Sequence, residues 1–413
     1  MQTWMRRIAG CAIGIAVLIG TGVGRADDAV FEVGGESVVK VPVEYHPKLG
    51  VFVKAYVNGQ GPYQFQITLS GATSITRRVA KAAAVQTSSI DRTLASGNQL
   101  EVQDVIDHAT LSLAGEPVSL KGAWVLPADD YHADVPIENY GGRLGLDRIR
   151  DKVVKTDFSN LQIVMTSRFD EPASGATELK QEVVDHIRMP IATVRFDGGK
   201  TSGDFALTLD DGGVWFMESS ELGKAQFGAN PKSTTIVCWT PHGLVHSLHA
   251  SSPAPISLVD RQIDDILLAR SVDPLQVPGR GFVLHAPLVD GALGLQGLKT
   301  FDIAVDNRHG VTRLTPRAQS APRCAGHPVS EPTPGFMPWV FEGKEKIGSV
   351  VLGSAADKAG VRPGDDIVSI DGGTVQAYYE KLYENHLHCV DSQPVTLILQ
   401  RGSARWQGTI SPN

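Results

Sequence analysis

A faint internal repeat constrains the fold of this chain more than any other feature of its sequence. Residues 53–73 and 192–213 each read as an alternating strand, a glycine-containing turn and a second alternating strand. Residues 141–163 and 290–311 each contain a Leu-Gly-Leu run, a short amphipathic turn, an alternating strand and an Asp/Asn turn. Chance similarity between β-hairpins is the alternative. Two motifs that recur in the same order predict two similar β-rich units over residues 38–315.

Length and composition agree with this interpretation. The 413 residues suffice for two or three domains, and the 42% hydrophobic and 20% charged residues are ordinary for a globular protein. The 43 glycines and 24 prolines favour short strands joined by turns. We therefore expect a mainly β protein.

The first residues predict a signal peptide over 1–26. An arginine pair precedes an apolar run over 8–23, and Gly24 and Ala26 are the small residues that a signal peptidase requires. A membrane anchor is the alternative, but the run is short and the chain turns acidic at Asp27. We expect cleavage after Ala26 and an exported, periplasmic or secreted protein.

The charge of the mature chain limits its partners. The signal peptide removes three arginines from the 38 basic residues, so 35 remain against 45 acidic residues, a net charge of −10. An acidic chain without a basic stripe is a poor nucleic-acid binder, and no later segment is apolar enough to span a membrane. We expect neither nucleic acid nor, after signal cleavage, a membrane as partner.

The repeated motifs carry a resemblance to pepsin-like and retropepsin-like aspartic proteases. In that superfamily each lobe has a hairpin that ends in an Asp-Thr/Ser-Gly turn, and a later strand with a Leu-Gly pair packs against the turn. The segment 142–151 resembles this later element, and the two copies cover about 38–170 and 185–315. The resemblance implies two β-barrel lobes related by a pseudo-twofold axis. Peptide or protein segments would bind in the cleft between them, and no cofactor would be needed.

In the second lobe, Asp210, Asp211 and Gly212 match the family turn, and Asp210 takes the position of a catalytic dyad aspartate. Peptide hydrolysis by this route uses two carboxylates that share a proton, one as general base and the other as general acid. Asp211 departs from the family because it replaces the hydroxyl residue. A plain Asp-Asp-Gly-Gly hairpin turn is the alternative.

In the first lobe, the corresponding turn has no acid. Ser70 and Gly71 fit the family turn and leave Leu69 at the aspartate position, whereas alignment of the preceding phenylalanines places Ser70 opposite Asp210. No Asp or Glu occurs within residues 45–90, so a shifted alignment cannot supply one. A single carboxylate cannot serve as general base and general acid together.

Three functions follow as alternatives, and whether the protein is an enzyme stays open. The first is a peptide-binding pseudoprotease. The second is an active aspartic endopeptidase with an unrecognised acid or a dimeric arrangement of second-lobe aspartates. The third is a scaffolding protein that acts through a C-terminal module.

That module follows a proline-rich linker, predicted over 316–338. Residues 353–372 strongly resemble the core of bacterial PDZ domains, and the resemblance implies a small α+β PDZ domain over 339–412. We expect helices over 355–359 and 375–386, strands over 367–370 and 395–400, and burial of Ile367, Val368 and Ile370 in the first of these strands.

PDZ domains bind chain ends by adding a strand and capturing a carboxylate with backbone N–H groups. The matching residues here are Gly335, Phe336 and Trp339, which would bind a C-terminal peptide. Pro338 has no N–H to donate. Docking of the module on the chain's own lobes is the alternative.

Three histidines, His242, His246 and His249, have a spacing that would converge on one face of a helix and could bind zinc. Pro241 and Gly243 break helices, and the segment falls where the second lobe should have strands. We therefore assign no metal site.

Three cysteines remain in the mature chain, Cys238, Cys324 and Cys389. An odd number cannot all pair within one chain. A bridge between Cys324 and Cys389 and unpaired thiols are both compatible with the sequence.

Overall fold

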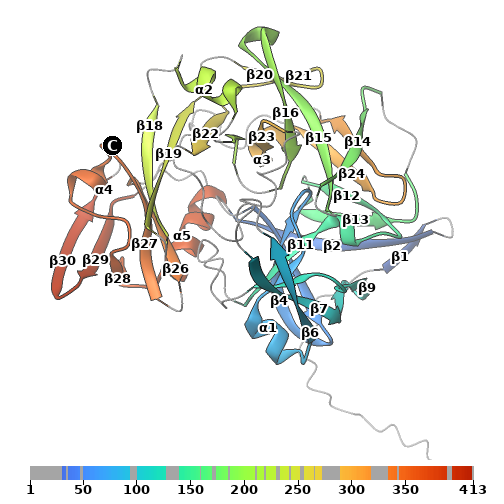
Figure 1. The fold of residues 1–413 in the computed structure, drawn as a ribbon, viewed down its shortest axis with the longest axis horizontal. Helices are drawn as coiled ribbons and strands as arrows, with labels where there is room; N and C mark the ends of the chain where they lie inside the picture. Colours follow the sequence, from blue (N-terminus) through green and yellow to red (C-terminus); the bar gives the residue numbers. More distant parts are fainter. Residues whose placement is uncertain are drawn as a thin grey trace, which may run out of the picture.

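A computed structural model shows that the chain is mainly β, as the sequence predicts (Figure 1). The structure describes residues 30–33, 36–46, 50–93, 100–126, 139–158, 160–169, 174–184, 187–209, 212–217, 220–228, 233–240, 243–251, 255–264, 266–271, 289–317, 334–341, 344–387 and 393–411. Within these ranges no helix is both long and apolar enough to cross a membrane. The predicted signal peptide lies outside them.

Residues 36–166 form a set of strands that we call the first repeat. A short preceding strand, β1 (Val30–Val33), pairs with β2, the first strand of this repeat. The elements are β2 (Glu36–His46), β3 (Gly50–Val57), β4 (Gln60–Thr68), β5 (Ser74–Ile75), α1 (Arg77–Ala82), β6 (Gln86–Thr93), β7 (Leu100–His108), β8 (Thr110–Leu113), β9 (Glu116–Ser119), β10 (Trp124–Val125), β11 (Tyr140–Gly145), η1 (Leu146–Arg148), β12 (Val153–Asp157) and β13 (Gln162–Thr166).

The central feature of the first repeat is β11, which lies between two strands joined by a turn. It runs parallel to β4 and antiparallel to β5, so it lies between these two strands in the sheet. Strand β10 then pairs parallel with β5 and antiparallel with β7. The hairpins β3–β4, β6–β7 and β8–β9 complete the repeat.

Residues 177–316 form the second repeat. Its elements are β14 (Thr177–Val184), β15 (Ile187–Phe196), η2 (Asp197–Gly199), β16 (Thr201–Leu207), β17 (Val214–Phe216), α2 (Glu221–Gly228), β18 (Thr234–Thr240), β19 (Gly243–Ser251), β20 (Ile256–Leu258), β21 (Arg261–Ile263), β22 (Leu267–Ser271), β23 (Gly291–Leu293), α3 (Leu295–Leu298), β24 (Phe301–Asp306) and β25 (Val311–Pro316).

The strand pairings of the first repeat recur in the second. Strand β23 is parallel to β16 and antiparallel to β17, as β11 is to β4 and β5. Strand β22 is parallel to β17 and antiparallel to β19, as β10 is to β5 and β7. The hairpins β15–β16, β18–β19 and β20–β21 correspond to β3–β4, β6–β7 and β8–β9.

The two repeats meet in one antiparallel sheet, visible at the right of Figure 1. Its strand order is β2-β13-β12-β24-β25-β14, so each repeat contributes its first strand and its last two. The join is between β12 and β24, where Val154 lies opposite Val305. A buried apolar cluster extends through both repeats and includes Phe65, Phe205 and Leu298.

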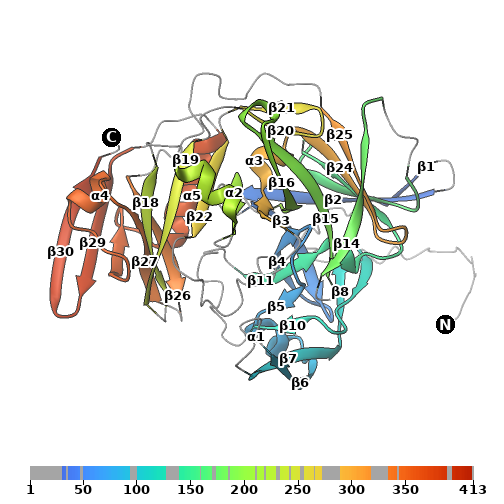
Figure 2. The same cartoon turned by 45° about the horizontal axis from the view of Figure 1, so that its top comes forward.

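Residues 334–411, which we call the C-terminal module, are shown in orange and red at the left of Figures 1 and 2. Its elements are β26 (Phe336–Phe341), β27 (Lys344–Val351), α4 (Ala355–Lys358), β28 (Asp366–Ile370), α5 (Val375–Leu387), β29 (Val395–Arg401) and β30 (Ala404–Ile410). Strand β27 pairs antiparallel with β26 and also with β18 of the second repeat.

Most expected elements of the module lie where the sequence places them, with three differences. Strand β26 begins at Phe336, inside the segment expected to be linker. Val368 is 49% exposed, because the register of β28 shifts between Ile367 and Ser369, so that Ile367 and Ile370 are both buried and Val368 faces outward. The last strand, β30, is not among the sequence expectations.

Candidate functional site

The candidate site is built around two turns, each of which joins the two strands that flank β11 or β23. In the first repeat the turn joins β4 to β5, and the Gly145 amide at the end of β11 donates to Thr73 Oγ1 at 3.0 Å. In the second repeat the turn joins β16 to β17, and the Gly294 amide donates to the Gly213 carbonyl at 2.8 Å. Each turn is therefore hydrogen-bonded to the glycine of the corresponding Leu-Gly pair.

The strand registers make Gly145 and Gly294 equivalent. Gly145 lies opposite Thr68 on β4, and Leu293, which precedes Gly294, lies opposite Leu207 on β16. When residues are counted from the ends of β4 and β16, Ser70 therefore corresponds to Asp210. This is the alignment that matches the preceding phenylalanines, Phe65 and Phe205. The second turn is longer by one residue, because Ser74 and Trp215 occupy equivalent places on the outgoing strands.

The first-repeat turn is tightly packed. Leu69 and Ser70 are 3% and 1% exposed. A methyl group at Gly71 would lie 2.7 Å from Thr68 Cγ2, so only glycine fits at that position. None of these residues carries a charge, so the turn itself supplies no acid or base.

Asp210 and Asp211 lie outside the described residues, which resume at Gly212. The carbonyl of Gly212 accepts a hydrogen bond from the Gln296 amide at 2.9 Å, and Gln296 Oε1 accepts one from the Leu267 amide at 3.0 Å. The end of the second turn is thus held by α3 and β22.

A carboxyl group that the sequence analysis did not single out lies beside the first turn. A methyl group built on Gly145 would be 2.5 Å from Asp147 Oδ1 and 2.6 Å from the Gly71 carbonyl oxygen. These two oxygens therefore border the same small space behind the turn. Asp147 Oδ1 is buried and has no hydrogen-bond partner in the described part of the chain.

Burial raises the pKa of Asp147, against the opposing effects of Arg148 and Arg150. The counterpart of Asp147 in the second repeat is the neutral Gln296. This acid directly follows the repeated Leu-Gly-Leu run, so a comparison of the two copies at this position could have identified it.

Side chains from the two repeats meet next to the first turn. Ala72 packs against a small cluster formed by Met189 and Ala206 of the second repeat. Asn307 Nδ2, at the end of β24, donates to the carbonyls of Leu146 and Ile149 at 2.6 and 3.2 Å. The first turn and η1 therefore lie at the boundary between the repeats.

The residues predicted for peptide capture in the module are engaged within the chain. The Gly335 carbonyl accepts from the Val351 amide at 2.8 Å, and Phe336 and Trp339 are buried. The Phe336 ring stacks on Tyr378 of α5 with centroids 6.0 Å apart.

Two further contacts hold the module together and join it to the first repeat. The Tyr379 hydroxyl donates to the Pro338 carbonyl at 3.1 Å, which occupies a backbone acceptor of β26. Phe52 and Tyr140 of the first repeat belong to the same buried cluster as the module core. In this arrangement the module packs against its own chain, which is the alternative to carboxylate capture.

The module also docks on the second repeat through β18. Cys238 lies opposite Ser349 of β27, and the Trp239 ring covers Gly364, where a methyl group would lie 2.6 Å from its Cδ1 atom. Lys346 Nζ is 5.3 Å from the centre of the same ring.

The predicted histidine and cysteine features are only partly described. His246 and His249 lie on β19, where side chains three residues apart point to opposite faces, so they do not converge as on a helix. No cluster of potential metal ligands occurs among the described residues. His242, Cys324 and Cys389 lie outside them.

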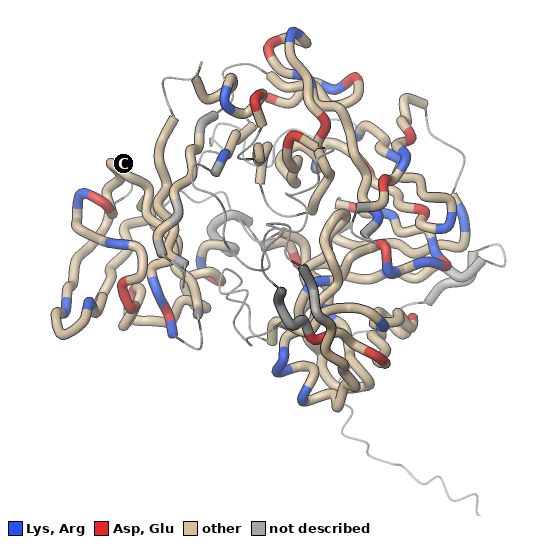
Figure 3. The backbone as a smooth tube through the Cα atoms, viewed as in Figure 1, with Lys and Arg blue, Asp and Glu red and all other residues tan. Residues whose placement is uncertain are grey.

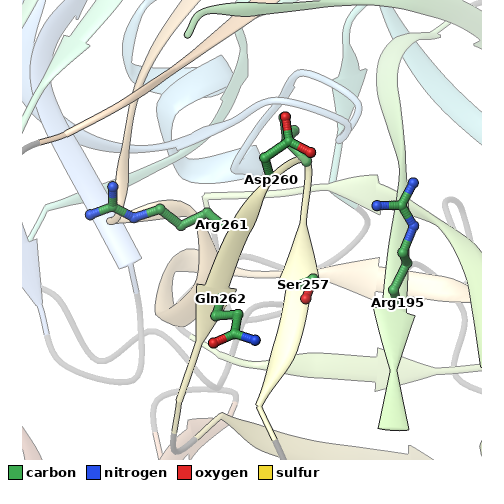
Figure 4. A pocket seen from close by; sticks show the side chains of 6 residues that line it. Arg195, Ser257, Asp260, Arg261 and Gln262 are labelled. Carbon is green, nitrogen blue, oxygen red and sulfur yellow. The ribbon is translucent and has the colours of Figure 1, made fainter. Parts of the chain in front are cut away.

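A surface depression of about 670 Å³ lies at the β20–β21 hairpin (Figure 4). Arg195, Ser257 and Gln262 lie side by side across three strands, and Asp260 and Arg261 border the turn. Figure 4 shows the two arginine side chains on opposite sides of the β20–β21 hairpin. This depression is separate from the two turns.

Charges of both signs are interspersed along the described backbone, as Figure 3 shows. No known family model matches the chain, and a search of curated proteins found no relative. Functional assignment therefore depends on the repeated fold, the two turns and the chemistry of their residues.

Proposed function

We propose that this chain is an exported aspartic-protease-like protein that binds peptides between its two repeats without cutting them, and that its C-terminal module is a PDZ domain. In this proposal the repeats are two β-barrel lobes related by a pseudo-twofold axis. The two turns face each other across the axis, and an extended peptide or protein segment lies between them.

One observation carries the proposal. Two turns occupy equivalent places in a duplicated strand scheme, but only the second contains aspartates, whereas Leu69, Ser70 and Gly71 form the first. An aspartic dyad needs two carboxylates that share one proton, so that one can act as base and the other as acid. A single carboxylate in this position can bind peptide groups, but it cannot act as base and as acid in the same reaction.

Asp147 supports a second candidate function, an active aspartic endopeptidase. Its Oδ1 atom and the Gly71 carbonyl border one space, and its raised pKa favours the protonated form that a general acid requires. If the first turn moves when peptide binds, Asp147 is the carboxyl that could complete a dyad with Asp210.

Digestion of a peptide library between pH 3 and pH 8 distinguishes the two candidates. We expect the mature wild-type protein and the Asp210→Asn variant to leave the library equally intact by mass spectrometry. Wild-type cleavage that both Asp210→Asn and Asp147→Asn abolish would overturn the pseudoprotease proposal and establish the endopeptidase. Cleavage that only Asp210→Asn abolishes would also overturn it, without a role for Asp147.

A further inference from the structure

The internal duplication permits a comparison between two hairpins that occupy equivalent places. Hairpin β6–β7 belongs to the first repeat and β18–β19 to the second. Strand β7 pairs with β10 as β19 pairs with β22, and both β10 and β22 run parallel to the strand that leaves the turn. Strand β6 therefore corresponds to β18.

The registers of the paired strands establish this correspondence residue by residue. Trp124 lies opposite Val105, which lies opposite Ser88 on β6. In the second repeat, Ala269 lies opposite His249, which lies opposite Thr234 on β18. Trp124 and Ala269 are equivalent because their partners on β5 and β17 lie opposite equivalent positions of β11 and β23.

It follows that Ser89 corresponds to Thr235 and Ile90 to Ile236. On β18 both residues take part in the addition of β27. The Leu352 amide donates to the Thr235 carbonyl at 2.9 Å, and Ile236 lies opposite Val351 and is only 8% exposed.

On β6 the same positions are uncovered. Among the described strands β6 pairs only with β7, and Ile90 is 44% exposed, in contrast to the buried Ile236. The backbone of Ser89 faces outward, because its counterpart Thr235 uses its outward carbonyl to bind β27.

We infer that the outer edge of β6 is a strand-addition site for an extended segment of another polypeptide. The segment binds antiparallel, as β27 does on β18, with a β-branched aliphatic residue opposite Ile90 and small uncharged residues beside it. Main-chain hydrogen bonds give affinity in this mode, and the residue opposite Ile90 gives selectivity. This site is separate from the turns of the proposed function and does not depend on them.

A second copy of the chain is a poorer occupant than a partner segment. The other exposed side chains described on β6, those of Gln86, Thr87, Ser88 and Ser89, are polar. A contact between two β6 strands would thus cover little apolar surface beyond one isoleucine per copy, far short of the roughly 800 Å² per partner of stable interfaces.

The test uses a fluorescent peptide with the sequence of residues 347–353, IGSVVLG, because its central residues are those that β18 binds. We expect saturable binding to the full mature chain by fluorescence anisotropy. Ile90→Lys and Ser89→Pro should each weaken binding at least tenfold, since the first removes the apolar contact and the second the outward N–H. A peptide N-methylated at the position of Leu352 should bind at least tenfold more weakly.

The matched control is Val368→Lys, which charges an equally exposed strand residue of the module and should leave the affinity unchanged. Three results would overturn the inference. The first is that the peptide shows no saturable binding to the wild type. The second is that Ile90→Lys binds the peptide as well as the wild type does, which would place the peptide elsewhere, for example at β18 in place of β27. The third is that the wild type sediments as a dimer that Ile90→Lys dissociates.

Discussion

At the scale of single residues, Asp147 most changes the chemistry expected of the first turn. The turn itself contains no acid, yet the chain places a partly buried carboxyl directly behind it. Burial raises the pKa of this group, so the folded protein binds its proton more tightly than the unfolded chain does.

This difference in proton affinity predicts the behaviour of Asp147→Asn. A raised pKa in the folded state contributes stability below the ordinary pKa of 3.8, and that contribution is lost as the pH rises through the folded value. Asparagine keeps the neutral shape and does not ionise. The variant should therefore unfold at a higher temperature than the wild type at pH 7, and the difference should shrink toward pH 3.8 and below.

Thermal unfolding followed by circular dichroism from pH 3 to pH 8 measures this effect. Asp151→Asn, which removes an exposed carboxylate nearby, serves as the control and should change stability by no more than about 0.5 kcal/mol. An Asp147→Asn variant that is less stable than the wild type at neutral pH would show that the ionised carboxylate is needed by the fold.

At the scale of elements, local patterns in the sequence indicated the short segments well. The alternating hairpin of residues 53–73 became β3 and β4, and the Leu-Gly-Leu runs became the ends of β11 and β23 followed by single helical turns. The pairing of β18 with β27 had no local signal, because strand addition depends on backbone groups that every sequence carries.

The β18–β27 contact predicts how the module behaves after its linker is cut. Limited proteolysis should cleave first within the segment between residues 317 and 334, as its prediction from the sequence as a proline-rich linker implies. The two fragments should nevertheless elute together in gel filtration, held by the paired strands and by Trp239 on Gly364.

Trp239→Ala in the cut protein should weaken this association, because it removes the ring that packs on Gly364. Trp406→Ala, which alters a tryptophan on β30 of the module, is the matched control and should leave the fragments together. Separation of the wild-type fragments on cutting would contradict the docked arrangement.

At the scale of the whole molecule, two copies of one strand scheme share a central sheet. The shared sheet joins β12 to β24, and Asn307 ties the second repeat to η1 of the first. These contacts give the two turns a fixed common framework, which a binding site composed of both would require.

The site was less predictable than the fold. Ser70 and Gly71 could be located from the turn pattern, because a glycine is required where Thr68 approaches so closely. A comparison of the two copies could have identified Asp147 as an acid opposite Gln296, but its burial beside a turn more than seventy positions away became visible only in the structure. Phe336 and Trp339, which were expected to bind a peptide, are both buried, and the sequence did not indicate this because the Phe336 ring packs on Tyr378 of α5, more than forty positions away.

Photo-crosslinking tests the central claim most directly. A peptide with a photoreactive residue at its centre is bound to the mature protein, irradiated, and located by mass spectrometry of the digested adduct. We predict that intact, uncleaved peptide is attached to residues 69–73 of the first repeat and also to residues 212–217 of the second, and that excess unlabelled peptide prevents both attachments. Adducts of shortened peptide, or adducts confined to one repeat or to the C-terminal module, would contradict the account.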